Sequence, residues 1–253
     1  MNGKREKMLE IENFNPIRYS EVKEKNLREI VMLRGNGCKW RKCRFCDYHL
    51  DSTNNEEENY ILNKEQLKKV TGKYHKLEVI NSGSFIDLDE KTMNLIEKIC
   101  IEKQIKQVHF ECHWNHRASV KTLKERFAKN KIDVIVKIGV ESFDFLFRES
   151  YLVKGIDARR PEEIAKYFDE VCLLQGIPGQ TKDFMIQDIE TGLKYFQRVC
   201  VNIMQENGKP IKPDPRVIKT FIEEVYPIYK NNERVDILLE NTAFGVGGVV
   251  THE

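Results

Sequence analysis

Apolar runs of strand length alternate along most of the chain with amphipathic segments of helical period. Several runs are continuous and rich in valine and isoleucine, which is typical of strands that are buried on both faces. The expected strands are residues 29–33, 77–80, 107–111, 133–140, 171–174, 199–204 and 235–239. The amphipathic segments, which we expect as helices, are residues 89–102, 119–130, 161–170, 182–196 and 214–229.

This alternation predicts an α/β fold in which parallel strands are joined by right-handed crossover helices. A closed barrel of this kind has eight strands, and about seven are expected here, so a partial barrel fits better. We predict a partial (βα)6-type barrel with an extra C-terminal strand. Residues 1–27 are expected as an N-terminal extension and residues 28–253 as a single domain. The polar, acidic segment 54–59 is expected as a solvated loop.

Composition and charge exclude several classes of protein. The 14 glycines and 7 prolines are too few for a collagen-like or low-complexity chain. A balance of 42 Lys and Arg against 40 Asp and Glu argues against a protein that coats a nucleic-acid backbone, so no stable nucleic-acid complex is expected. No apolar stretch approaches the ~18 residues of a membrane helix, and the first residues lack a secretory signal. We therefore expect a cytoplasmic protein that does not enter a membrane.

The strongest chemical signal is a loop of three cysteines directly after the first expected strand. Residues 33–49 have the sequence LRGNGCKWRKCRFCDYH, in which Cys38, Cys43 and Cys46 are spaced C-x4-C-x2-C. In a reducing compartment cysteines act as metal ligands or buried thiols rather than as disulfides. Thiolates this close together favour a soft metal centre of iron or zinc.

Three kinds of metal site are compatible with this spacing. A zinc site could take His49 as its fourth ligand. A plant-type two-iron centre would need a distant fourth cysteine, and Cys100 is the next along the chain. Alternatively, the three cysteines could hold a four-iron cluster and leave one iron open to a cofactor or substrate. The loop follows a parallel strand, at the end where such folds place their chemistry, and this position favours the third site.

The loop resembles the cluster loop of the radical S-adenosylmethionine (radical SAM) superfamily, with Phe45 as the aromatic residue before the last cysteine. The commonest spacing in that superfamily has three residues, not four, between the first two cysteines. Four later segments occur in the order that the resemblance requires. They are NSGSF at 81–85, FECH at 110–113, GVES at 139–142 and GIPGQT at 176–181. The resemblance thus spans residues 29 to about 181 and implies a radical SAM partial barrel.

The resemblance implies a [4Fe-4S] cluster held by Cys38, Cys43 and Cys46, together with a bound S-adenosyl-L-methionine (SAM). The activity that it implies is reductive cleavage of SAM and abstraction of a hydrogen atom by a 5′-deoxyadenosyl radical. A flavodoxin or ferredoxin would supply the electron. In the superfamily, the residue at Glu141 meets the ribose of SAM and the residue near Lys154 pairs with its carboxylate. The residues implied at the cofactors are Phe45, Ser82, Gly83, Ser84, Glu111, Glu141, Ser142, Lys154, Gly176, Ile177 and Pro178.

Within the superfamily, the arrangement most resembles the queuine lyases of queuosine salvage. That resemblance implies a small nucleoside or nucleotide substrate, queuosine 5′-phosphate, from which queuine is released. A guanine-like edge presents adjacent N–H donors, which a buried carboxylate can accept, and a phosphate suits a basic side chain. The candidate substrate residues are Glu206, Asp236, Glu240 and Arg34. Two alternatives stay open: another radical SAM reaction on a small metabolite or peptide, and a non-catalytic zinc-binding interaction module.

We expect Cys43→Ala to lose both the cluster and the activity, because two remaining thiolates cannot hold a cluster with one iron open. Cys100→Ala and Cys200→Ala should keep both, since scattered cysteines of this kind act as small hydrophobic residues. Iron content and SAM cleavage after anaerobic reconstitution measure the effect. Full iron content in Cys43→Ala would contradict the assignment of the three ligands.

Overall fold

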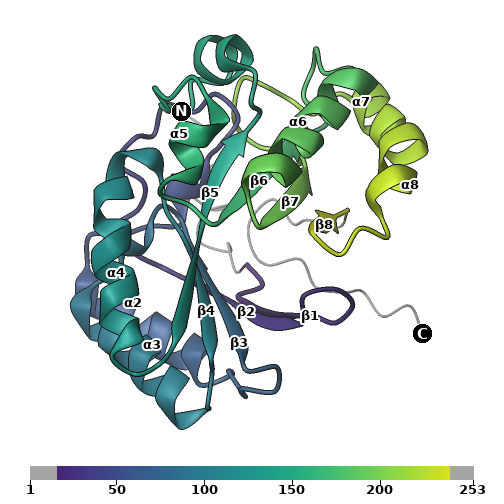
Figure 1. Cartoon of the computed structure of the whole chain (residues 1–253). Helices are drawn as coiled ribbons and strands as arrows, with labels where there is room; N and C mark the ends of the chain where they lie inside the picture. Colours follow the sequence, from purple (N-terminus) through teal and green to yellow (C-terminus); the bar gives the residue numbers. More distant parts are fainter. Residues whose placement is uncertain (1–15, 240–253) are drawn as a thin grey trace, which may run out of the picture.

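The computed structural model describes residues 16–239, which include an eight-stranded sheet curled into a half-barrel (Figure 1). The strands lie across the sheet in chain order, and neighbouring strands are parallel except for the antiparallel pair β1 and β2. This arrangement confirms the predicted partial barrel. The strands are β1 (Tyr19–Val22), β2 (Arg28–Leu33), β3 (Lys76–Asn81), β4 (Gln107–Glu111), β5 (Asp133–Glu141), β6 (Glu170–Gln175), β7 (Arg198–Ile203) and β8 (Val235–Leu238).

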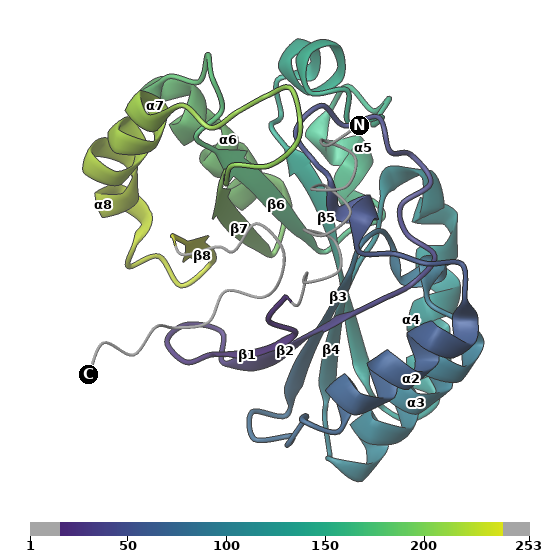
Figure 2. The ribbon, with the colours of Figure 1, turned by 180° about the vertical axis from the view of Figure 1, so that it is seen from behind.

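Helices cover the outer, convex face of the sheet, as Figures 1 and 2 show from opposite sides. Side chains at their first turns fix where they begin; for example, Thr181 accepts a hydrogen bond from the Phe184 N–H at the start of α6. No helix in residues 16–239 is long and apolar enough to cross a membrane. The helices are α2 (Glu56–Leu67), α3 (Glu90–Glu102), α4 (Val120–Ala128), α5 (Pro161–Ala165), α6 (Lys182–Tyr195), α7 (Pro215–Thr220) and α8 (Tyr226–Tyr229).

Two elements were not expected from the sequence. Strand β1 lies within the segment expected as an N-terminal extension and pairs with β2 at the edge of the sheet. Helix α2 begins inside segment 54–59, so the prediction of a solvated loop there was wrong for residues 56–59. Asn55 accepts a hydrogen bond from the Glu58 N–H, and the glutamates of the first turn favour the positive end of the helix dipole. The acidic residues therefore begin a helix.

The two faces of the sheet bury different kinds of side chain. On the outer face, residues such as Val31, Val79 and Val136 pack beneath the helices in the main hydrophobic core. On the inner face, near the amino ends of the strands, the buried side chains are charged or polar. We call this second set, together with the half-buried Arg198, the charged floor; its buried members are Arg28, Glu78, His109, Lys137, Glu170 and Asp236.

Ion pairs connect the charged floor across the open side of the half-barrel. The Arg28 guanidinium contacts Glu78 on β3 at 2.5 Å and Asp236 on β8 at 3.2 Å. Asp236 also contacts Arg198 at 2.5 Å, and Lys137 pairs with Glu78. Burial alone disfavours the Glu78 carboxylate, but Lys137 and Arg28 hold its pKa well below the usual range. Arg28 thus ties β2 to β8, two strands that share no backbone hydrogen bonds.

We expect Arg28→Ala to lower the free energy of unfolding by about 3–5 kcal/mol, because it leaves two buried carboxylates short of a cation. Lys68→Ala, the control, breaks an exposed pair with Glu65 and should cost about 1 kcal/mol or less. Urea denaturation measures both losses. Equal, small losses would show that the buried pair does not hold the half-barrel together.

Candidate active site

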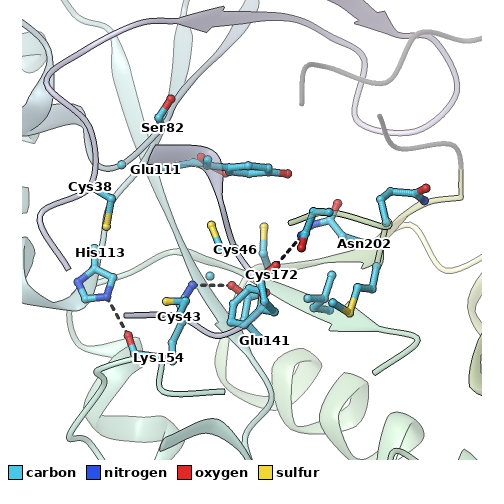
Figure 3. Close-up of a pocket in the computed structure, with 18 of the residues that line it drawn as sticks. Cys38, Cys43, Cys46, Ser82, Glu111, His113, Glu141, Lys154, Cys172 and Asn202 are labelled. Carbon is cyan, nitrogen blue, oxygen red and sulfur yellow. Dashed lines mark hydrogen bonds and ion pairs between the residues drawn. The ribbon is translucent and has the colours of Figure 1, made fainter. Parts of the chain in front are cut away.

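A cavity lies inside the half-barrel at the carboxyl ends of the strands (Figure 3). Its wall combines the loop after β2 with the ends of the later strands, as the sequence predicted. Tyr48, Asn202 and Gln205 also line it, although no motif marks them in the sequence. The predicted residues that line the cavity are Cys38, Cys43, Phe45, Cys46, Ser82, Gly83, Glu111, Glu141 and Lys154.

The cysteine loop is held in place by hydrogen bonds from its backbone to two other segments. The Cys38 N–H donates to the Ser82 carbonyl at 2.9 Å, and a Cβ on Gly83 would lie 2.9 Å from the Cys38 nitrogen. Only glycine allows this close approach of the two backbones. On the other side, the Asn207 amide donates to the Phe45 carbonyl at 2.7 Å. The sheet therefore determines where the three thiols lie.

The three thiols fit a cluster better than a closed zinc site. All are free, and burial raises the pKa of Cys43 and raises that of Cys46 to about 12, so a cationic metal centre is needed to stabilise the thiolates. In residues 16–239, no three His, Cys, Asp or Glu side chains are placed to bind one ion, as zinc requires. Cysteines that bind different irons of a cluster need not converge in this way. Cys100, the candidate fourth ligand, lies in the main hydrophobic core.

A buried ion pair faces the thiols. The Lys154 ammonium donates to the Glu141 carboxylate at 2.6 Å. Burial alone would lower the pKa of Lys154, but Glu141 raises it above its usual value, so the side chain stays charged. Glu141 has a φ of 66° and follows a register shift after Gly139, and strain of this kind is characteristic of functional positions.

Two aromatic residues, Trp40 and His113, hold the backbone around Lys154. The Trp40 indole N–H donates to the Val153 carbonyl at 2.8 Å, and His113 Nε2 donates to the Lys154 carbonyl at 3.0 Å. The two rings stack with centroids 6.1 Å apart. Burial lowers the pKa of His113 to about 4, so its ring is neutral near pH 7. The cysteine loop and the end of β4 thus jointly position the ammonium.

Several residues predicted at the cofactors do not line the cavity. The Ser84 hydroxyl accepts a hydrogen bond from the His113 N–H at 2.8 Å, and the Ser142 hydroxyl accepts one from the Asp144 N–H at 3.1 Å. Ile177 packs against Phe45 beneath the cysteine loop. These residues support the wall. The set that does not line the cavity comprises Ser84, Ser142, Gly176, Ile177 and Pro178.

The structure does not bring the described substrate candidates to the cavity. Asp236 does not line the cavity, and its two oxygens are ion-paired with Arg28 and Arg198. Arg34 pairs with Glu58 on α2. Glu206 is exposed and pairs with Lys212, while Glu240 lies outside the described residues. None of the three candidates that the structure describes therefore lines the cavity.

A curled parallel half-barrel with a three-cysteine loop after its first parallel strand is the architecture of a radical SAM enzyme. No protein-family model matches the chain, and no curated protein does. Among solved structures, a queuine lyase from Clostridium spiroforme bound to SAM and queuine matches with a TM-score of 0.83. The two are 45% identical, and the match covers 88% of this chain and 96% of the other. The chain belongs to the queuine lyase family.

Proposed function

We propose that this enzyme uses a [4Fe-4S] cluster and SAM to release queuine from queuosine 5′-phosphate in queuosine salvage. One observation carries the proposal: a single cavity brings the three thiols together with the Glu141–Lys154 pair, in a chain 45% identical to a queuine lyase. When bound, the cluster and SAM supply the 5′-deoxyadenosyl radical that takes a hydrogen atom from the substrate. The protein supplies position and excludes water.

The Glu141–Lys154 pair is suited to hold the two polar ends of SAM. An ammonium has three donors, and Lys154 gives one to Glu141, so others remain for the SAM carboxylate. The Glu141 carboxylate can accept hydrogen bonds from ribose hydroxyls while it stays paired. Because both side chains are largely buried and fixed, little ordering is needed when the cofactor binds.

The exposed side of the cysteine loop suits an acidic electron donor such as a flavodoxin or ferredoxin. Four cations on this loop are exposed, and an acidic partner docked on them would lie next to the cluster. All seven cysteines are free, which supports the expected cytoplasmic location. The four exposed cations are Lys39, Arg41, Lys42 and Arg44.

We expect Lys154→Met to weaken SAM binding by about 10- to 100-fold without loss of iron, because a charge-assisted hydrogen bond contributes about 1.5–3 kcal/mol. The matched control is Lys182→Met, which removes only an exposed pair with Glu224. Equilibrium binding of SAM to the anaerobically reconstituted proteins measures the difference. Unchanged SAM affinity in Lys154→Met would contradict this role for Lys154.

The reaction itself is tested with the reduced, reconstituted enzyme, SAM and queuosine 5′-phosphate. Free queuine and 5′-deoxyadenosine should form together, and deuterium on the substrate ribose should appear in 5′-deoxyadenosine. The dephosphorylated nucleoside should react less well, because loss of the 5′-phosphate removes charge-assisted contacts between the substrate and the protein. If neither compound stimulates release of 5′-deoxyadenosine, the substrate is wrong even though the family membership stands.

A further inference from the structure

Glu111 is the acidic side chain of the cavity that the proposed function leaves without a partner. It ends β4 and lines the cavity, and no hydrogen bond or ion pair reaches its carboxyl group from residues 16–239. Glu141, the other acid of the wall, is bonded to Lys154 at 2.6 Å. A carboxyl group kept free in a cavity is available for a ligand that brings its own donors.

The cations below Glu111 are already committed to other carboxylates. Lys137 pairs with Glu78, and Arg28 and Arg198 both contact Asp236. The charged floor holds as many acids (Glu78, Glu170, Asp236) as guanidinium and ammonium groups (Arg28, Lys137, Arg198). An ionised Glu111 is therefore an excess negative charge. Burial raises its pKa to about 7, with Lys137 opposing the shift and Glu78 adding to it.

Strand register places Glu111 deeper in the half-barrel than the pair expected to bind SAM. Glu111 is in register with Lys137 of β5, which precedes Glu141 by four residues. The register shift before Glu141 reduces this to three residues on the paired strand β6, which is about 10 Å at about 3.3 Å per residue. In Figure 3, the labelled Glu111 and the Lys154–Glu141 pair border the same space from different sides. A ligand that reaches Glu111 therefore extends past Lys154 towards the charged floor.

We infer that the Glu111 carboxylate binds the pyrimidine edge of the 7-deazaguanine base and selects for its exocyclic amine. The inference rests on the proposed function and names the residue that recognises its substrate. The edge presents two adjacent, nearly parallel donors, N1–H and the amine N–H, which match the two oxygens of one carboxylate. Two such donors also stabilise the ionised form that burial disfavours.

Two ligand cations could pair with the Glu111 carboxylate in place of the guanine edge. Binding of base analogues distinguishes these possibilities. The first is the secondary ammonium in the side chain of queuine, which 7-deazaguanine lacks. The second is the methionyl ammonium of SAM. The exocyclic amine is absent from 7-deazahypoxanthine, which otherwise has the ring system of 7-deazaguanine. These compounds test the hydrogen-bonding edge without the side chain or the ribose.

The experiment measures dissociation constants of queuine, 7-deazaguanine, 7-deazahypoxanthine and SAM for the reconstituted wild-type enzyme, Glu111→Gln and Glu111→Asp. The wild type should prefer 7-deazaguanine over 7-deazahypoxanthine by about tenfold or more, since a hydrogen bond to a charged group contributes about 1.5–3 kcal/mol. Glu111→Gln should lose that preference, because its amide places a donor against the amine. Glu111→Asp, which keeps two acceptors, should retain part of it.

Iron content equal to that of the wild type shows that the variants are folded. Glu65→Gln, on the exposed face of α2, is the matched control and should bind every ligand as the wild type does. The inference is overturned if Glu111→Gln weakens the binding of queuine but not that of 7-deazaguanine. That result would mean that the carboxylate binds the ammonium in the queuine side chain. It is also overturned if only SAM binding falls. Both results leave the proposed reaction intact, whereas failure of the wild type to release queuine removes the reaction itself.

Discussion

Pairing of buried charges across the open side of the half-barrel is the interaction on which the rest of the structure depends. An incomplete barrel has no last pair of strands to close it, so its inner face would otherwise admit water along its whole length. Arg28 on β2 binds Asp236 on β8, and the Lys25 ammonium adds hydrogen bonds to carbonyls at the start of β8, including that of Val235 at 2.6 Å. The amino ends of the strands are thereby closed, and the cavity is confined to the carboxyl ends.

This closure also determines the position of the cysteine loop. The loop has little regular structure of its own, and its place is set by the Ser82–Gly83 turn after β3 and by Asn207 after β7. These two segments come from separate parts of the sheet, so they meet the loop only if the curvature of the sheet is fixed. Curvature in turn depends on the charged floor. A change far from the thiols, at Arg28 for example, therefore acts on the site through the shape of the sheet.

Much of the fold could be predicted because its strongest signals are local. The apolar runs predicted seven of the strands, and the spacing of Cys38, Cys43 and Cys46 predicted the chemistry of the first loop. Strand β1 was missed because it is four residues long and polar, and its stability comes from pairing with β2. The roles of Trp40 and His113 could not be predicted either, because their hydrogen bonds join segments more than 40 residues apart in the chain.

The contrast between Asp236 and Glu111 shows why the substrate contacts were the hardest part to predict. Both are acids on the inner face of parallel strands, and residue type and strand position alone do not separate them. What separates them is the number of ion pairs each one makes, since Asp236 pairs with two guanidinium groups and Glu111 makes no ion pair in the described part of the chain. That number depends on which strands become neighbours across the open side. An acid in such a half-barrel becomes a ligand contact when the charges around it are already balanced, and only the folded arrangement determines that balance.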